Sequence, residues 1–390
     1  MNIKKIRRDT PGCHDKIFFN SAGASLMPAV VVETIKGYLE QEEQLGGYMV
    51  QDLQETMINE FYDEVAKLLN CHPRNVAFAY NATDAYAKAI SSIAFNPGDT
   101  ILTTDDDYVS NYIAFISLKK RFGINILRGK NLDNGDLDLE HFEAQIQQHQ
   151  PRLIAVTHVP TNSGKIQDAV SVGKLCKKYD VLYLLDACQS VGQIPVDVEE
   201  IGCDFLSVTG RKFLRGPRGT GFLYASDRML EEGYMPLFAD AGGADWIAPE
   251  AYRPHKEAKR FQLWENSYAI LLGLKEAVRY LNGLGVQNVY DYNQTLLKQL
   301  TDGLQAIPGI KTYDEGSQRS NIITFRKGDL EQEEIKTKLD EAGIFYSVSG
   351  INYALIDYQK KGVDWTVRFS PHYFNTTEEI NRALHVVDSL

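Results

Sequence analysis

Seven short apolar runs lie between residues 75 and 225, and they constrain the fold of this chain more than any other feature. Several runs are nearly continuous in Val, Ile, Leu and Phe, which is typical of parallel strands covered by helices on both faces. The segments between them, such as 168–179, indicate β–α–β units with right-handed crossovers. We expect strands at 75–80, 100–104, 124–129, 152–159, 181–187, 204–210 and 219–225.

The last two runs are joined only by RKFLRGPR, which is too short for a helical crossover, so one strand of this pair should run antiparallel. After residue 225 the pattern changes, and residues 240–262, rich in Gly, Pro and charge, predict a loop. We then expect helices at 267–285, 289–307, 330–343 and 376–390, and strands at 321–327 and 365–370.

This order of elements predicts an α/β fold with a seven-stranded, mostly parallel sheet in a large domain, followed by a small α+β C-terminal domain. A chain of 390 residues is long enough for two such domains. We expect residues 16–268 to form the large domain, and residues 1–15 and 269–390 to form the small domain with the N-terminal segment.

Composition and charge exclude several classes of protein. The chain has 41 Lys and Arg residues against 52 Asp and Glu residues, and its net charge of −11 disfavours binding to nucleic acid or to an anionic membrane. No apolar run approaches the roughly 18 residues of a membrane span, and no apolar stretch follows the basic N-terminus, so no signal peptide is expected. The five cysteines include no CxxC pair and the eight histidines no helical pair, which predicts a cytoplasmic protein with reduced thiols and no metal site.

Polar side chains at the carboxyl ends of the predicted strands mark the candidate site, because ligands bind there in open parallel sheets. Asp186 follows the run VLYLL, where it either caps the next turn or keeps a heteroaromatic ring nitrogen protonated. Lys212 follows DFLSVTG, with Arg211 and Thr209 beside it as candidate phosphate ligands. Lys212 is either a surface charge or, in a pocket, an amine of lowered pKa that can form a Schiff base.

Two further strand ends add an anion site and an aromatic ring. Asn81, Ala82 and Thr83 open a helix after NVAFAY, and they either cap this helix or bind an anion together with its free N–H groups. Tyr108 follows TILTT and is either a packing residue or a lid over a ring. A lysine, an acid for a ring nitrogen, a phosphate site and an aromatic lid together match the needs of pyridoxal phosphate.

Three segments in register carry a resemblance to a known family: THVPTNSGKIQD (157–168), LLDACQSVGQIPVDV (184–198) and DFLSVTGRKFLRGPRGTGFLY (204–224). They resemble successive blocks of fold-type I pyridoxal-phosphate enzymes of the class V aminotransferase superfamily. This superfamily includes cysteine desulfurases, kynureninase, isopenicillin N epimerase and C–S lyases. The resemblance covers nearly the whole chain and implies the PLP-dependent transferase fold of type I.

The resemblance implies roles for the residues at the strand ends. Lys212 would bind pyridoxal phosphate covalently and act as a base, Asp186 would pair with the pyridinium nitrogen, and Gln189 would bond the phenolic oxygen. Tyr108 would stack on the pyridine ring. The phosphate ligands would be the backbone of Ala82 and the side chains of Thr83, Thr209 and Arg211, the last standing where cysteine desulfurases usually have His.

The resemblance also implies a substrate site and a homodimer. Arg368, in WTVRFSPHYFNT, matches the arginine that binds the substrate α-carboxylate, a task that suits a guanidinium fork; the alternative is an ordinary surface ion pair. Thr161 or Asn162 would lie near the ring oxygen and the substrate, and the loop with Ala22 would line the substrate pocket. Glu265 lies in a segment that resembles the one lent by the neighbouring subunit, which implies shared active sites.

The expected reaction depends on what the chain lacks. A cysteine desulfurase needs a nucleophilic cysteine on the loop before the Arg368 strand, and residues 343–365 contain none. Of the remaining relatives, the chain most resembles C–S lyases of ergothioneine biosynthesis and isopenicillin N epimerase. We expect β-elimination from a cysteine S-conjugate or its sulfoxide, giving pyruvate and ammonia, with epimerisation or transamination of an amino acid as alternatives. A non-enzymatic binding module is disfavoured because Lys212 and Asp186 are both present.

Overall fold

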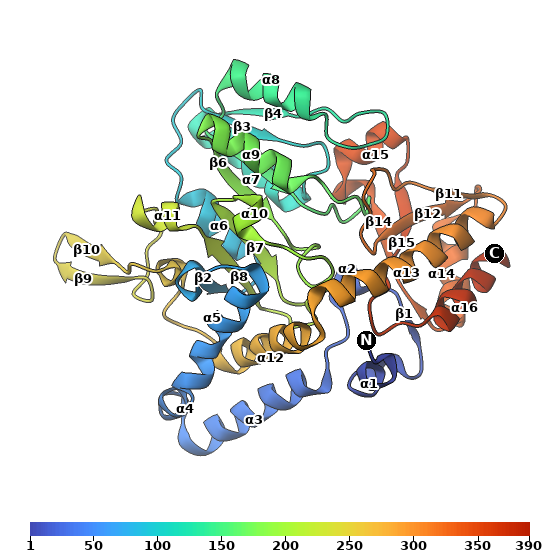
Figure 1. Cartoon of the computed structure of the whole chain (residues 1–390), viewed down its shortest axis with the longest axis horizontal. Helices are drawn as coiled ribbons and strands as arrows, with labels where there is room; N and C mark the ends of the chain where they lie inside the picture. Colours follow the sequence, from blue (N-terminus) through green and yellow to red (C-terminus); the bar gives the residue numbers. More distant parts are fainter.

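A computed structural model describes all 390 residues, and its large domain is built on one seven-stranded sheet. Figure 1 shows this sheet, whose strands follow the order β2-β8-β7-β6-β5-β3-β4. The strands are β2 (Val76–Ala79), β3 (Thr100–Thr103), β4 (Asn125–Arg128), β5 (Leu153–Thr157), β6 (Leu182–Asp186), β7 (Phe205–Thr209) and β8 (Gly221–Ala225). Each strand falls within one of the predicted apolar runs, so the predicted fold class is confirmed.

One strand of the sheet, β8, runs against the others. It pairs antiparallel with both of its neighbours, β2 and β7, whereas the other pairs in the sheet are parallel. This confirms the inference from the short connection between β7 and β8. Because that connection makes no crossover, Lys212 stays at the sheet edge where β7 ends.

Helices cover both faces of the large sheet and bury its side chains in two separate cores. One face packs against α5 (Glu55–Leu69), α8 (Leu139–His149), α9 (Ala169–Tyr179) and α12 (Tyr268–Leu284). The other packs against α6 (Ala82–Ser91), α7 (Val109–Phe122) and α11 (Asp227–Glu231). The side chains of successive strand residues pack into the cores on opposite faces of the sheet, as those of Leu184 and Leu185 do. This double cover is the reason why the strand sequences are continuously apolar.

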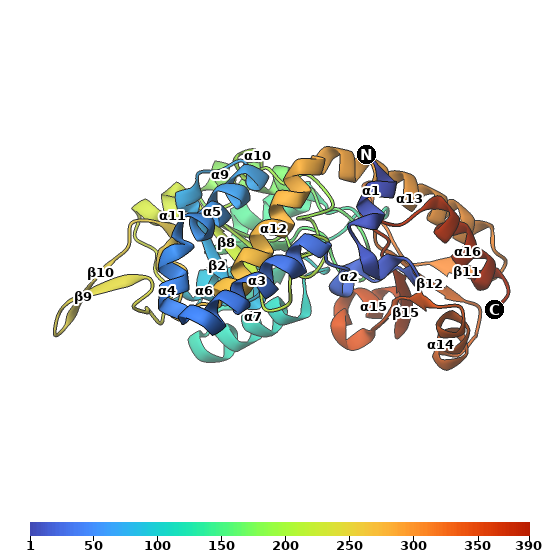
Figure 2. The same cartoon turned by 90° about the horizontal axis from the view of Figure 1, so that it is seen from below.

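The small domain has its own four-stranded sheet in the order β11-β12-β15-β14. It lies beside the large domain in Figure 2. Its elements are β11 (Ile310–Thr312), β12 (Ile323–Lys327), β14 (Ser347–Gly350), β15 (Trp365–Phe369), α13 (Val286–Ala306), α14 (Gln332–Glu341), α15 (Leu355–Lys361) and α16 (Thr377–Asp388). The short elements β11, β14 and α15 were not predicted, because pieces of three to seven residues show too little periodicity.

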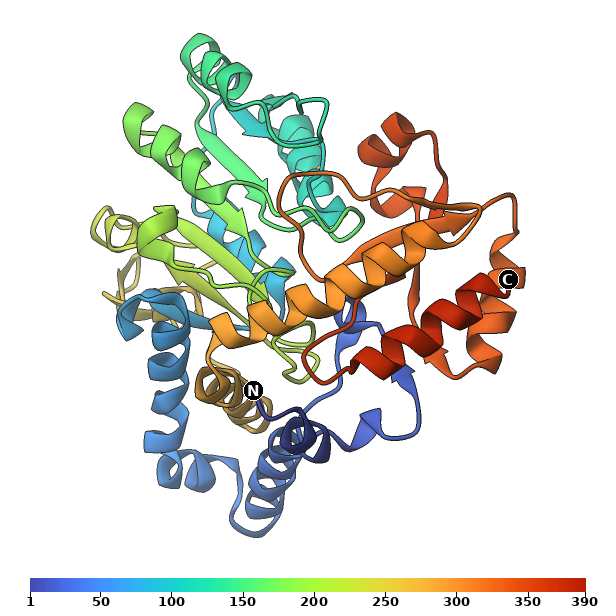
Figure 3. The ribbon, with the colours of Figure 1, turned by 45° about the vertical axis from the view of Figure 1, so that its right-hand side comes forward.

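The N-terminal segment runs beside both domains, as the blue ribbon of Figure 3 shows. Helix α3 (Ala29–Leu45) packs along α12. Strand β1 (Ile17–Phe18) pairs in parallel with β13 (Ile344–Phe345) of the small domain, and α2 (Ser21–Ala24) follows it. The domain boundaries that we placed at residues 16 and 268 stay predictions.

Residues 240–262 differ from the predicted loop because they contain a hairpin. Strands β9 (Ala244–Ala248) and β10 (Ala251–Pro254) pair antiparallel and project from the large domain in Figure 1. Their side chains are almost all exposed, and Trp246 is 81% exposed. Since neither face of the hairpin is buried, its sequence lacks the alternation of apolar and polar residues that predicts a strand.

Three other findings concern the whole chain. All five cysteines are free thiols. No group of three or more His, Cys, Asp or Glu side chains is arranged to hold a metal ion. No helix combines the length and the apolar character that crossing a membrane would require.

Gly173 in α9 allows a test of how closely this helix packs. A Cβ at this position would lie 1.7 Å from the carbonyl oxygen of Ile201. Replacing Gly by Ala inside a helix normally stabilises a protein by about 0.5–1 kcal/mol. We expect Gly173→Ala instead to lower the free energy of unfolding by about 1–3 kcal/mol, because the backbone must shift to relieve the clash.

Gly37 in α3 is the matched control, since a Cβ there would meet nothing within 4 Å. We expect Gly37→Ala to raise the free energy of unfolding by about 0.5–1 kcal/mol. Denaturant unfolding of the two variants measures both changes. Equal stabilisation by both substitutions would contradict the close packing of α9.

Candidate active site

The carboxyl ends of β6 and β7 bring predicted cofactor residues together. Asp186 ends β6, Thr209 ends β7, and Lys212 follows β7. Tyr108 precedes the first residue of α7, and the amine of Lys212 lies 5.7 Å from the centroid of its ring. Side chains from separate parts of the sequence therefore meet at one sheet edge.

Lys212 is only 7% exposed and has charged neighbours. Burial lowers the pKa of its amine; Cys188 and Asp186 act against this shift, and the positive charges of Arg211 and Arg368 add to it. The neutral amine is the nucleophile in Schiff-base formation. A lowered pKa therefore favours covalent binding of an aldehyde at Lys212.

Asp186 is 3% exposed, and each of its carboxylate oxygens accepts a hydrogen bond from the chain. The backbone N–H of Cys188 donates to Oδ1 and the side-chain amide of Asn111 donates to Oδ2, both at 2.9 Å. Asp186 forms no salt bridge with a cation of the chain. Because a buried carboxylate needs a cation or donors to offset desolvation, a protonated ring nitrogen would complete this site.

Asn111 and Asp107 extend this network, and sequence reasoning missed both. Asn111 lies 3.1 Å from Asp107 Oδ1, which also accepts a hydrogen bond from Thr157 at 2.6 Å. Burial raises the pKa of Asp107 to about 6, although hydrogen bonds from Thr103, Thr157 and Asn111 oppose the shift. The run of three aspartates at 105–107 was the signal in the sequence, because acids at a buried strand end must find partners.

The predicted phosphate ligands lie where α6 begins and β7 ends. Asn81 caps α6 by accepting a hydrogen bond from the N–H of Asp84 at 2.9 Å. The other N–H groups of the first turn, which include those of Ala82 and Thr83, have no partner within the helix. Thr209 is 6% exposed at the end of β7. A helix N-terminus with hydroxyl groups nearby suits a phosphate.

Thr161 contacts both a residue predicted to bind the cofactor ring and a residue predicted to bind the substrate. Its hydroxyl oxygen accepts hydrogen bonds from Gln189 at 2.8 Å and from Arg368 at 2.6 Å. Gln189 also donates to the carbonyl of Ala22 at 3.1 Å, and its own Oε1 is buried without a partner. A buried amide oxygen without a donor is a group that a ligand can satisfy.

Arg368 is the clearest indication of an anionic ligand. Its side chain is buried, its Nε has no hydrogen-bond partner, and it forms no salt bridge with a carboxylate of the chain. Burial lowers the pKa of Arg368 to about 10; Tyr358 opposes this shift and Arg211 adds to it. Since an unpaired buried cation is costly, a substrate carboxylate would provide the missing charge.

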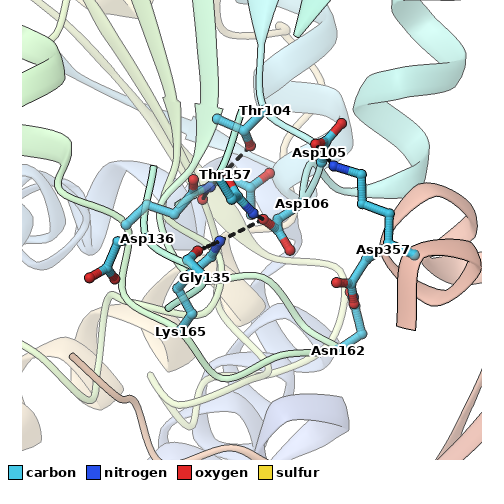
Figure 4. Close-up of polar contacts among 12 residues, drawn as sticks. Thr104, Asp105, Asp106, Gly135, Asp136, Thr157, Asn162, Lys165 and Asp357 are labelled. Carbon is cyan, nitrogen blue, oxygen red and sulfur yellow. Dashed lines mark hydrogen bonds and ion pairs between the residues drawn. The ribbon is translucent and has the colours of Figure 1, made fainter. Parts of the chain in front are cut away.

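Other predicted site residues have partners of their own. Asn162 donates to Asp357 of α15 at 2.8 Å, and Figure 4 shows the two side chains facing each other. Arg211 donates to the carbonyl of Gly23, in the loop predicted to line the substrate pocket. Glu265 lines a surface recess of about 260 Å³, and its predicted part in a neighbouring subunit's site stays a prediction.

The residues present fit pyridoxal phosphate. The sheet edge combines a buried amine of lowered pKa, a carboxylate without a cation, an unpartnered amide oxygen and a helix N-terminus. Comparison with known proteins then decides the family, because the aminotransferase class-V model matches residues 17–383. The chain belongs to the aminotransferase class-V family. It is a pyridoxal-phosphate-dependent enzyme of that family.

Relatives of this class-V enzyme include proteins named probable cysteine desulfurase. The one from Methanothermobacter thermautotrophicus is 27% identical over 97% of this chain and 96% of its own length. The one from Pyrococcus abyssi is 27% identical over 99% of this chain and 96% of its own length.

Solved structures share the fold over nearly the whole chain. The apo cysteine desulfurase of Thermococcus onnurineus NA1 has a TM-score of 0.91 and 25% identity, covering 99% of this chain and 97% of that protein. The cystine C–S lyase C-DES, in complex with cysteine persulfide, has a TM-score of 0.86 and 22% identity, covering 97% of this chain and 99% of that protein.

Proposed function

We propose that this class-V enzyme cleaves the carbon–sulfur bond of a cysteine S-conjugate or its sulfoxide by β-elimination. Lys212 takes the α-proton, and the Cβ–S bond breaks with its electron pair leaving on sulfur. One water molecule hydrolyses the remaining three-carbon fragment, which keeps the amino nitrogen, to pyruvate and ammonia, so the reaction needs no oxidant. When bound, pyridoxal phosphate supplies the electron sink for negative charge at Cα.

The chain's own side chains would divide the remaining tasks. Arg368 binds the α-carboxylate of the substrate, and Thr161 holds the guanidinium in place through its hydroxyl. Asp186 keeps a proton on the ring nitrogen of the cofactor, while Asn111 orients its carboxylate. Tyr108, whose ring centroid lies 5.7 Å from the Lys212 amine, would cover the ring of the cofactor.

The positions of the cysteines are the observation that favours β-elimination over the formation of a persulfide on the protein. None of the five lies in residues 343–365, which precede the Arg368 strand. Cys188 follows Asp186 and is the cysteine beside the site, but it is buried, and burial raises the pKa of its thiol. The names of the relatives support a substrate derived from cysteine. A C–S lyase of this kind needs no protein thiol.

All five thiols should resist alkylation near neutral pH. Burial raises the pKa of every one of them: Cys13, Cys71, Cys176, Cys188 and Cys203. Since the thiolate is the reactive form, we expect iodoacetamide to leave turnover unchanged while it alkylates free cysteine in a parallel sample. Loss of activity together with a single labelled cysteine would contradict this expectation and favour a sulfur-carrying thiol.

Proton NMR in deuterated water tests the reaction class directly. The enzyme loaded with pyridoxal phosphate is mixed with cysteine S-conjugates, their sulfoxides and plain amino acids. Pyruvate formed from a conjugate supports the proposal and ranks the substrates. Loss of an α-proton signal without pyruvate would overturn elimination and favour the epimerase or aminotransferase alternative.

We also propose a cytoplasmic homodimer with shared active sites. Large apolar side chains are exposed around the recess that contains Glu265, including Tyr48 at 77% and Trp264 at 63%. Such a surface favours association with a second copy. Free thiols are typical of proteins in a reducing compartment, which supports the cytoplasmic part of the proposal. Analytical ultracentrifugation measures the oligomeric state, and a monomer at micromolar concentration would contradict the dimer.

A further inference from the structure

Helix α15 of the small domain contacts the large domain through charged side chains that have no part in the proposed reaction. Asp357 is 7% exposed and accepts a hydrogen bond from Asn162 of the large domain at 2.8 Å. Lys361 pairs with the same carboxylate at 2.8 Å. Lys360 pairs with Asp105, which lies in the connection between β3 and α7 that also contains Tyr108. Figure 4 shows Asp357 and Asn162 facing each other, with Asp105 and Asp106 nearby.

The contact between Asp357 and Asn162 is adjacent to the proposed substrate site, because Asn162 directly follows Thr161 in the sequence. Thr161, the residue before Asn162, accepts hydrogen bonds from both Gln189 and Arg368. Thr161 and Asn162 belong to a turn at 161–163 that follows β5. The position of this turn therefore decides where the hydroxyl that holds Arg368 lies.

The small domain also fixes the other end of this turn. Gly164 has a φ of +62°, and a Cβ there would lie 2.2 Å from the carbonyl oxygen of Ile322. The backbone N–H of Ser320 donates to the Gly164 carbonyl at 2.7 Å. With one end held by this backbone contact, the side chain of Asn162 is the second anchor, and Asp357 is its acceptor.

Burial makes the ionised form of the Asp357 carboxyl group unfavourable in free energy. Burial and the negative charge of Asp106 raise its pKa, and Lys361 and Asn162 oppose the shift. Lys361 and Asn162 thus stabilise the negative charge of Asp357. Of these two partners, only Asn162 belongs to the turn beside the proposed substrate site. A hydrophobic residue could pack the same helix without these polar contacts.

We propose that Asp357 is a positioning residue of the substrate site, which holds Asn162 and thereby fixes Thr161 against Arg368. The inference rests on the proposed role of Arg368 as the ligand of the substrate carboxylate. It does not depend on whether the reaction ends in elimination, because every alternative reaction begins with a bound amino acid.

The Asp357→Ala variant should separate substrate binding from turnover. We expect KM to rise about 10- to 100-fold, the range that corresponds to losing a hydrogen bond to a charged group, with kcat nearly unchanged. The measurement uses the loaded enzyme and the amino acid that reacts fastest in the NMR panel. The dissociation constant, from the change in cofactor absorption on titration with this amino acid, should rise in parallel.

Two further variants show whether Asp357 acts through Asn162. Asp357→Asn keeps an oxygen that can accept from Asn162, so its KM should stay close to that of the wild type. Asn162→Ala should raise KM as Asp357→Ala does, and the double variant should add little, since both remove the same contact. Asp364→Asn, an exposed carboxylate on the same segment, is the matched control and should change nothing.

The outcomes distinguish this inference from the proposed function. Unchanged KM in Asp357→Ala and Asn162→Ala, combined with weak binding in Arg368→Ala, would overturn the positioning role alone. Unchanged KM in Arg368→Ala would overturn the substrate site on which the inference rests. If Asp357→Ala fails to fold, Asn162→Ala and Asp357→Asn still decide, because a normal KM in Asn162→Ala contradicts the inference.

Discussion

Lys212→Ala is expected to abolish covalent binding of pyridoxal phosphate. It should also lower kcat/KM by about 10²- to 10⁴-fold or more, because this range is the usual contribution of a positioned acid–base group. The reason is the position of the amine, which is buried at the end of β7, 5.7 Å from the centroid of the Tyr108 ring. Burial lowers its pKa, which favours the neutral form that acts as nucleophile and as base. No other lysine shares this position.

Borohydride reduction followed by peptide mass spectrometry measures the covalent link. The wild-type enzyme should carry the reduced cofactor on the peptide that contains Lys212, and Lys212→Ala should carry none. Lys174→Ala, which removes an exposed lysine on α9, is the matched control and should retain both the link and the activity. A fully active Lys212→Ala variant with a reducible cofactor would show that the amine lies elsewhere.

Arg368→Ala is expected to lower kcat/KM for an amino acid by roughly 30- to 5,000-fold. This range corresponds to the about 2–5 kcal/mol lost when one partner of a buried, hydrogen-bonded charge pair is removed. Arg368 suits this role because it is buried, has an unpartnered Nε and forms no salt bridge within the chain. Arg368→Lys should be intermediate, since lysine keeps the charge but lacks the fork of donors.

The rate of α-proton exchange in deuterated water measures this loss whether or not elimination follows. Arg326→Ala is the control, because Arg326 lies on the neighbouring strand β12 and forms an exposed ion pair with Asp364 at 3.4 Å. Its removal should change kcat/KM little, as surface pairs contribute weakly. If Arg368→Ala kept the wild-type KM and kcat, the arginine would not bind the carboxylate.

The large sheet was predictable because its signals are local. Each strand is a run of apolar residues long enough to be recognised on its own, and the short connection after β7 fixes the direction of β8. The hairpin β9–β10 was missed for the opposite reason. Its side chains face solvent, so its backbone pairing leaves no pattern in the sequence.

The candidate site was predictable only in part. Strand ends and a family resemblance predicted Asp186 and Lys212, because polar residues directly after buried strands are conspicuous. Asn111 was missed, since an asparagine within a helix has many possible partners and nothing local selects Asp186, which is 75 residues away.

The fold class, the order of the strands along the chain and the strand ends that carry the candidate cofactor residues all follow from the amino-acid sequence alone. Which distant polar groups meet, such as Arg368 with Thr161 and Asp357 with Asn162, depends on the tertiary fold. The physical reason is that burial imposes a periodic pattern on neighbouring residues, whereas a hydrogen bond between residues about 200 positions apart leaves no local trace.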